Sequence, residues 1–342
     1  MIRNKKKTIN RNNKKINRKF SWKLLLGFIL FQLIFTVITA PFVLLYGPFE
    51  EAKKTYVSSA KASMNYQWLA TMFLSDEKIA ELTGENEATV DITNEDNSLI
   101  EIPKAKDDTI EYQMVTGDSN AKFKGYALVI KDPTRVKVGI TSKLNKEGET
   151  VSEIADNYDA VAAINGGYFT DDEGAEKWTS NGGIPVGYLM SEGKELHNGV
   201  GPGSTTMVAI TQDGLMQVGK FTVAELKEKN ISEAMTYKDK ETLVNGGEAV
   251  PIYEESSSPR TMIGQRKNGS IVFVILDSKN PETRMAATLK EAQEVMIKLG
   301  CYTAVNLDGG KSATMYLNDE VINNPSYALG ERPIASGFIV KR

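Results

Sequence analysis

The stretch CYTAVNLDGGKSATM, residues 301–315, joins an uncharged, mostly apolar run to an acid, two glycines, a lysine and a hydroxyl. An apolar run of this length, followed by glycine, predicts a strand over 301–308 that is buried on both faces. Glycine at the end of the strand lets the backbone turn sharply and lets another backbone or a ligand approach closely. Asp308 is therefore expected at a strand tip, facing whatever the following loop encloses.

Three NGG triplets elsewhere in the chain have a similar form. Two of them end apolar runs, AVAAINGG at 160–167 and TLVNGG at 242–247, whereas SNGGIP at 180–185 is more typical of an ordinary turn. If strands with such ends are neighbours, their Asn and Asp side chains converge, and ligand sites form at strand ends in this way. The alternative is that each triplet is a hairpin turn. For the three strand-terminal copies together, we expect a site.

The remaining pattern predicts an α+β fold. Apolar residues at helical spacing predict a helix over 286–299 that stops at Gly300. Many strands, few helices and both hairpins and crossovers indicate a large mixed sheet with flanking helices, in a domain spanning 110–342. The predicted strands are a pair at 126–133 and 135–141 joined by an Asp-Pro turn, hairpins over 205–219, 260–277 and 312–324, and a final strand at 334–341.

The amino-terminal residues predict a membrane anchor. Residues 1–23 contain ten of the 41 Lys and Arg residues and no acid, which leaves 31 basic and 44 acidic residues, a net charge of −13, for the rest. Such an acidic chain lacks the charge footprint of a nucleic-acid-binding protein. Residues 24–46 carry no charge and are long enough to cross a bilayer. A basic flank predicts a cytoplasmic tail at 1–23, a single-pass transmembrane helix at 24–46 and an extracellular catalytic domain. A signal cleaved near Ala40 and a buried core helix are the alternatives.

Two segments separate the anchor from the domain. Residues 47–83 predict a helical stalk with an apolar stripe at Met64, Trp68, Met72 and Ile79. This stripe packs either on the domain or on another copy of itself, so self-association through the stalk is one expectation. Residues 84–109 are acidic and polar, and we interpret them as a linker.

Cysteine and histidine usage narrows the chemistry. Cys301 is the single cysteine, so no intramolecular disulfide can form, and His197 is the single histidine. A multi-histidine metal centre is excluded, and His197 is expected in a surface loop. A divalent cation such as Mg²⁺ or Ca²⁺ would need oxygen ligands, for which the acidic segment TDDEGAE at 170–176 is a candidate.

Arg260, in SSSPRTMIG at 256–264, is the candidate anion binder. A planar guanidinium keeps its charge and binds phosphate or carboxylate through two hydrogen bonds. A solvated arginine at a strand end is the ordinary alternative.

Four motifs, INGGYF, VNGGEAV, PRTMIG and NLDGGKSATM, occur in this order between residues 164 and 315. In this combination the chain resembles the phosphodiester glycosidase family over roughly residues 120–342. The resemblance implies hydrolysis of a sugar-1-phosphodiester, and its bacterial branch implies a link with exopolysaccharide. Two departures are Lys311, where the family commonly has a third glycine, and the segment after Asp277, where glycine is usual. By matching motif, the implied site residues are Asn165, Gly166, Gly167, Asn245, Gly246, Gly247, Arg260, Thr261, Asp308, Gly309, Gly310 and Ser312.

The residue chemistry is compatible with this reaction. Phosphate leaves as an anion, so cleavage of the glycosidic C–O bond needs little proton donation, and a fixed cation near the phosphate stabilises the developing charge. We expect Arg260, with Lys311, to hold the phosphate, and Asp308 to act at the anomeric carbon. Asp277 and Glu291 are candidates for a second carboxylate, and Asn165 and Asn245 for contacts with sugar hydroxyls.

The sequence thus predicts a membrane-anchored extracytoplasmic hydrolase that acts on a phosphorylated glycan of the cell envelope or an exopolysaccharide. Two other functions stay open. One is a non-catalytic carbohydrate-binding or scaffold domain in polysaccharide assembly, which could dispense with Asp308 and Arg260 as a reactive pair. The other is a metal-dependent phosphodiesterase that cuts the P–O bond with an all-oxygen metal site.

Overall fold

The computed structural model describes residues 21–62, 66–85, 97–170, 181–253, 256–280, 282–283 and 285–342. Its internal contacts divide the chain into two units, Met1–Lys53 and Lys54–Arg342. Residues 1–20 of the predicted cytoplasmic tail, residues 86–96 of the predicted linker and residues 171–176 of the acidic segment lie outside the described residues.

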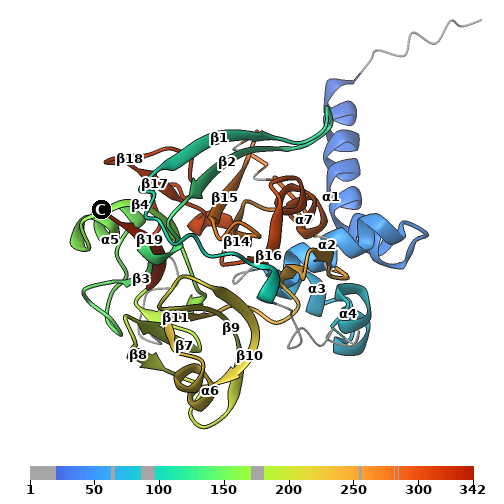
Figure 1. The fold of residues 1–342 in the computed structure, drawn as a ribbon. Coiled ribbons are helices and arrows are strands. Elements are labelled where there is room, and N and C mark those ends of the chain that lie inside the picture. Colours follow the sequence, from blue (N-terminus) through green and yellow to red (C-terminus); the bar gives the residue numbers. More distant parts are fainter. Residues whose placement is uncertain are drawn as a thin grey trace, which may run out of the picture. The chain divides into compact units, whose positions relative to one another are not determined.

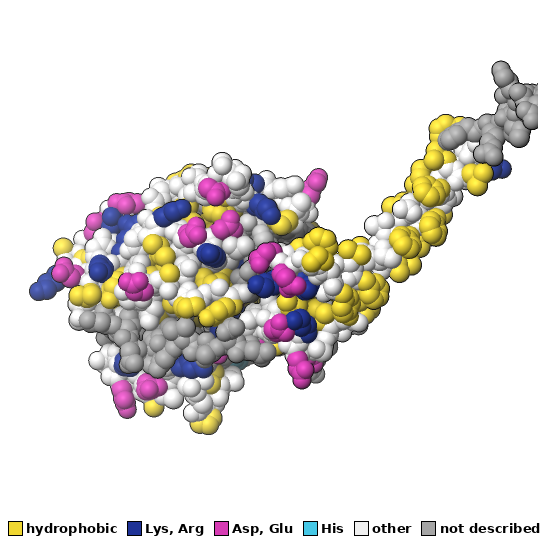
Figure 2. Space-filling view, turned by 90° about the vertical axis from the view of Figure 1, so that its right-hand side faces the viewer, with side chains coloured by type: hydrophobic (Ala, Val, Ile, Leu, Met, Phe, Trp, Pro, Cys, Tyr) yellow, Lys and Arg dark blue, Asp and Glu magenta, His cyan; other side chains and the backbone are white. Residues whose placement is uncertain are grey.

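The first unit contains the long helix α1 (Trp22–Tyr46). Ser21 begins the helix by accepting a hydrogen bond from the Leu24 N–H at 3.5 Å. Apolar side chains cover the helix and are largely exposed, and only Leu45 is buried (Figure 2). At about 1.5 Å per residue, 25 residues span the apolar core of a bilayer. The helix is therefore long and apolar enough for a membrane anchor, and a signal sequence has the same properties.

The predicted stalk is not one helix. It contains α2 (Glu50–Ala62), α3 (Trp68–Thr71) and α4 (Asp76–Thr83). Ser75 starts α4 as its N-cap, with its hydroxyl 3.3 Å from the Lys78 N–H. The apolar stripe is broken accordingly: Ile79 is buried, whereas Trp68 and Met72 are exposed. At the end of α4, Lys240 Nζ donates hydrogen bonds of 2.9 Å to the carbonyl oxygens of Gly84 and Glu85.

The second unit is built around a large antiparallel sheet, in agreement with the predicted α+β class (Figure 1). All strand pairs between described residues are antiparallel, where a mixed sheet was expected. The seven strands run in the order β1 (Ile110–Thr116), β2 (Phe123–Ile130), β15 (Ile271–Ser278), β14 (Arg260–Arg266), β16 (Cys301–Asn306), β12 (Thr242–Asn245) and β13 (Glu248–Ala249).

Two five-stranded sheets and a short pair complete the fold. One sheet has the order β10 (Met216–Thr222), β9 (Ser204–Thr211), β11 (Ile231–Thr236), β7 (Tyr188–Ser191) and β8 (Lys194–Asn198). The other has the order β18 (Glu320–Val321), β17 (Met315–Leu317), β4 (Ala160–Asn165), β19 (Ser336–Lys341) and β3 (Val136–Ile140), and β5 (Phe169–Thr170) pairs with β6 (Ile184–Pro185). The predicted hairpins correspond to β9–β10, β14–β15 and β17–β18. His197 lies in β8 and not in a loop.

The Asp-Pro turn joins two strands as predicted, and these strands belong to different sheets. β2 pairs with β1 and β15, whereas β3 pairs with β19 in a different sheet. Asp132 caps the short 3-10 helix η2 (Pro133–Arg135), because its carboxylate accepts a 2.9 Å hydrogen bond from the Thr134 N–H. This rigid turn moves the chain from one sheet to the other.

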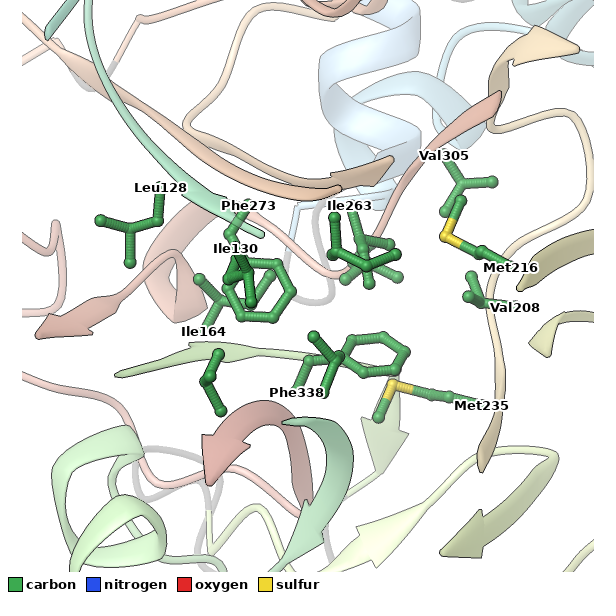
Figure 3. Close-up of a cluster of buried hydrophobic side chains, with 14 of the residues drawn as sticks. Leu128, Ile130, Ile164, Val208, Met216, Met235, Ile263, Phe273, Val305 and Phe338 are labelled. Atoms are coloured by element: carbon green, nitrogen blue, oxygen red, sulfur yellow. The ribbon is translucent and has the colours of Figure 1, made fainter. Parts of the chain in front are cut away.

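The main core lies between the three sheets. Phe273 of the large sheet and Phe338 of β19 face each other with ring centroids 6.5 Å apart, among aliphatic side chains from all three sheets (Figure 3). A separate helix covers the other face of each sheet: α7 (Leu289–Lys298) the large one, α5 (Val151–Asn157) that of β4 and α6 (Val223–Glu228) that of β9 (Figure 1). The register of the large sheet brings the start of β14 beside the ends of β15 and β16.

Replacing Phe273 with Ala tests the importance of this core. The side chain is completely buried, so the substitution leaves a cavity and is expected to lower the free energy of unfolding by about 3–5 kcal/mol. Leu329→Ala is the control, because Leu329 is 84% exposed and its loss should cost less than about 0.5 kcal/mol. Chemical denaturation measures both; equal effects would contradict the described core.

Candidate active site

Three of the sequence motifs meet at the side chain of Asn165. Its Oδ1 accepts hydrogen bonds from the Thr261 hydroxyl at 2.7 Å and from the Thr314 N–H at 3.1 Å. Its Nδ2 donates to the carbonyl oxygen of Asp308 at 2.6 Å. The tips of β4, β14 and β16 therefore converge as predicted. Asn165 is only 1% exposed, however, so its side chain holds the strand tips together. This differs from the expectation that Asn165 contacts a sugar hydroxyl.

The glycines of the motifs allow close approach of neighbouring segments. A Cβ on Gly309 would lie 2.6 Å from the Pro259 carbonyl oxygen, and one on Gly166 would lie 2.6 Å from Met235 Sδ. Gly310 has a φ of 61° and donates its N–H to the same Pro259 oxygen at 2.8 Å. These glycines fix the loop after Asp308 against the turn before Arg260.

The Asp308 carboxyl is the reactive candidate at this junction. The residue is partly exposed, although its carboxyl is largely withdrawn from water, and this burial raises its pKa from 3.8 to about 6. Hydrogen bonds from Ser312 and from the Gly309 backbone, together with the charge of Arg332, oppose the shift. The group is therefore mainly ionised at neutral pH but more basic than an exposed aspartate.

Arg332 is a cation of the site that the sequence did not reveal. Its Nη1 lies 3.5 Å from Ser312 Oγ, and its guanidinium carbon lies 4.7 Å from the centroid of the Phe169 ring. The residue is partly exposed and its charge acts on Asp308. A guanidinium stacked on an aromatic ring is oriented for planar recognition of an anion.

Arg260 is more buried than an anion-binding residue at a strand end would be. Its Nε donates to the Ala287 carbonyl oxygen at 3.1 Å, and its Nη2 donates to the carbonyl oxygen and hydroxyl of Ser256 at 2.6 and 3.0 Å. The residue is 6% exposed. Its guanidinium thus fixes the segments on either side of β14, while its charge remains close enough to favour the ionised form of Tyr168. Lys311, the other expected cation, is exposed on the loop after Asp308.

The second NGG triplet is not part of the site, and this prediction was wrong. β12 runs antiparallel to β16, with Thr242 opposite Val305 and Val244 opposite Ala304, so Asn245 lies at the opposite edge of the sheet from Asp308. Gly246 and Gly247 have φ values of 63° and 84°, which makes them the two central residues of a tight turn between β12 and β13. The hairpin alternative holds for this triplet.

The two expected second carboxylates have other partners. Asp277 accepts hydrogen bonds from Asn323 Nδ2 at 3.0 Å and from the Asn324 N–H at 2.6 Å, and burial raises its pKa to about 6. Glu291 is the third residue of α7 and forms a capping box with Thr288, whose N–H donates to its carboxylate at 2.8 Å. Glu291 therefore caps a helix, and Asp277 holds the turn after β18.

A buried carboxylate that the sequence analysis missed, Glu241, lies beside the end of β16. It accepts hydrogen bonds from the Tyr168 hydroxyl at 3.1 and 3.0 Å and from Asn306 Nδ2 at 2.7 Å. Tyr168 in turn has a pKa well above its usual value, because of burial and then because of the charges of Glu241 and Asp308. The signal was an acid directly before a strand, not after one. Among the described residues, no group of three His, Cys, Asp or Glu side chains could hold a metal ion.

The capping role of Glu291 can be tested by stability. Replacing Glu291 with Ala removes the carboxylate from the capping box and should lower the free energy of unfolding by about 1 kcal/mol. Glu291→Gln keeps an acceptor for the Thr288 N–H and should cost less. Urea denaturation compares the two; an Ala variant as stable as the parent would argue against the cap.

Burial of Asp308 predicts a stability change with a definite pH dependence. Because its pKa is higher in the folded chain, the folded state binds more protons between pH 4 and 6, and stability falls as pH rises through about 6. Asp308→Asn cannot ionise, so it should be more stable than the parent by about 1–3 kcal/mol at pH 7 and equal to it near pH 4. Denaturation at both pH values measures this. A variant that is less stable at pH 7 would contradict it.

Comparisons with known proteins identify the family of the chain. A family model described as phosphodiester glycosidase matches residues 158–341, more than half of the chain. The chain is 24% identical over 202 residues to N-acetylglucosamine-1-phosphodiester alpha-N-acetylglucosaminidase of Bos taurus, which covers 53% of this chain and 36% of that protein. It is 25% identical over 197 residues to the Homo sapiens protein of the same name, with 52% and 36% covered. The matches thus span about a third of the length of these relatives.

A solved structure shows the same fold. The catalytic domain of zebrafish N-acetylglucosamine-1-phosphodiester alpha-N-acetylglucosaminidase, auto-inhibited by its pro-peptide, matches with a TM-score of 0.57 and 19% identity, covering 75% of this chain and 96% of that one. The family match includes the loops that carry Asn165, Arg260, Asp308 and Arg332. The chain belongs to the phosphodiester glycosidase family.

Proposed function

We propose that this chain hydrolyses a sugar-1-phosphodiester and releases the sugar from a phosphorylated acceptor. Membership of the phosphodiester glycosidase family supports the reaction class. The observation that carries the proposal is the position of Asp308: a partly exposed residue whose buried carboxyl has a pKa of about 6, held at the meeting point of three motif-bearing strand tips. The matched relatives are named for a phosphodiester of N-acetylglucosamine, which supports a phosphorylated glycan as the substrate class.

In the proposed reaction, Asp308 acts at the anomeric carbon. It either activates a water molecule or stabilises the positively charged sugar that develops as the C–O bond breaks. The phosphate departs as an anion, so the site needs a cation more than a strong acid. Arg332 is the partly exposed candidate for that role, and Arg260 adds a buried positive charge nearby. Ser312 connects the two halves of the site, because it contacts both Arg332 and the Asp308 carboxyl.

We further propose that α1 anchors the chain in a membrane, with the domain on the extracytoplasmic side. The uncharged residues 24–46 of this helix, preceded by ten basic residues in 1–23, support this orientation. A substrate in the cell envelope or an exopolysaccharide would be accessible there. Self-association through residues 47–83 stays a prediction.

The proposal is tested with a panel of sugar-1-phosphodiesters. Asp308→Asn should reduce kcat by at least about a hundredfold, because the neutral amide can neither activate water nor stabilise a cation. Its stability at pH 7, measured in parallel, shows that the domain is folded. Turnover close to that of the parent would remove Asp308 from the reaction.

Hydrolysis in ¹⁸O-labelled water separates the two possible bond cleavages. Attack at the anomeric carbon places the label in the released sugar, whereas P–O cleavage places it in the phosphate. Label in the phosphate, together with loss of turnover in EDTA, would favour the metal-dependent phosphodiesterase instead.

A further inference from the structure

Glu241 fixes the direction of the hydrogen bonds made by two neighbouring side chains, Tyr168 and Asn306. It is 6% exposed, and its carboxylate accepts hydrogen bonds from the Tyr168 hydroxyl and from Asn306 Nδ2. The Asn306 N–H also donates to the Glu241 carbonyl oxygen at 2.9 Å, so backbone and side chain are both fixed. Lys238, which is 58% exposed, forms an ion pair with it at 3.8 Å. An ionised carboxylate can only accept hydrogen bonds.

The phenol of Tyr168 is consequently oriented as an acceptor. It has one proton, and this proton is committed to Glu241. Its remaining capacity is the lone pairs of the oxygen. Burial and the charges of Glu241 and Asp308 raise its pKa well above the usual value, so the phenol stays protonated at neutral pH. The Asp308 N–H donates to the carbonyl oxygen of Gly166 at 3.1 Å, two residues before Tyr168, so the phenol belongs to the same site.

The side-chain amide of Asn306 is oriented in the same way, with its donor toward Glu241. Its Nδ2 donates to Glu241 and to the Leu307 carbonyl oxygen at 2.8 Å, which settles which end of the amide is the oxygen. The residue is 1% exposed, and its Oδ1 accepts no hydrogen bond from the described residues. A buried acceptor without a partner is costly, and a donor brought by a ligand or a water molecule would relieve it.

We propose that Tyr168 is a specificity-determining residue, which accepts a hydrogen bond from a hydroxyl or acylamino N–H of the sugar, and that Glu241 is the positioning residue that enforces this direction. The inference rests on the proposed function and adds to it. Substrates with a donor at that position are preferred over analogues that lack it, because the oriented phenol oxygen then has a partner. Glu241 acts only through Tyr168 and Asn306.

The test uses the full-length chain in detergent, with Asp308→Asn as the background so that binding is measured without turnover. The probes are glucose 1-phosphate, N-acetylglucosamine 1-phosphate and the monodeoxy analogues of glucose 1-phosphate, titrated by calorimetry. With Tyr168 present, loss or replacement of the sugar hydroxyl that donates to the phenol should change the affinity by about tenfold. The other deoxy analogues should bind like the parent sugar phosphate. Tyr168→Phe should weaken the preferred sugar by the same factor and leave the analogue unchanged, so that their difference disappears.

Glu241→Gln gives an independent readout. Its amide can donate to the phenol oxygen, so the preference should be lost although Tyr168 is intact. Removal of the charge should also lower the pKa of Tyr168, measured by NMR with ¹³Cζ-labelled tyrosine. Tyr112→Phe is the matched control, because Tyr112 is 48% exposed on β1, and this variant should behave like the background.

The outcomes separate the two proposals. If Tyr168→Phe and Glu241→Gln weaken every probe equally, or weaken none, the inference is wrong while the proposed function stands. If no sugar 1-phosphate binds the background and the wild-type chain cleaves no member of the phosphodiester panel, the proposed function fails and the inference fails with it.

Discussion

One buried amide, that of Asn165, ties together the segments on which the site depends. Its oxygen accepts from Thr261 and Thr314 and its nitrogen donates to the backbone of Asp308, so one side chain joins β4, β14, β16 and the start of β17. A buried polar group left unpaired costs about 1–3 kcal/mol. The amide is satisfied only when all these segments reach the same point. The location of Asp308 therefore follows from assembly of the sheets and not from the conformation of a loop.

Antiparallel pairing decides which strand ends join this point. At one edge of an antiparallel sheet, the ends of some strands lie beside the starts of their neighbours. Asp308 follows the end of β16 and Arg260 begins β14, so they share an edge. Asn245 ends β12, whose direction opposes that of β16, and it lies at the far edge; Glu241, just before β12, lies near Asp308 instead. The sequence identified Asn245 correctly as a strand end. It could not show the direction of that strand, which depends on pairing with residues some sixty positions later.

Features with local causes could be predicted. The hairpins over 205–219 and 260–277, the helix before Gly300 and the buried strand before Asp308 all follow from short-range pattern, and the structure contains each. The roles of Tyr168 and Arg332 have no local signal, because their burial and their partners come from distant parts of the chain. For the stripe at residues 64–79, a local pattern was present but led to the wrong helix boundaries. Its spacing suited one long helix, but the cap at Ser75 starts a new one.

The residues that hold the strand tips and those proposed to react differ in exposure, and this difference follows from what each must do. Asn165 and Thr261 are fully used in holding strand tips and are buried. Asp308, Tyr168 and Arg332 are partly exposed, which the proposed contacts with a substrate require. A carboxylate stabilised by many donors would be a weak base, since donors lower its pKa. Asp308 has few, so burial prevails and its pKa stays near 6, at a cost in folding free energy. For a phosphate leaving group, which needs no strong acid, a moderately basic carboxylate beside a cation is the combination that the chemistry requires.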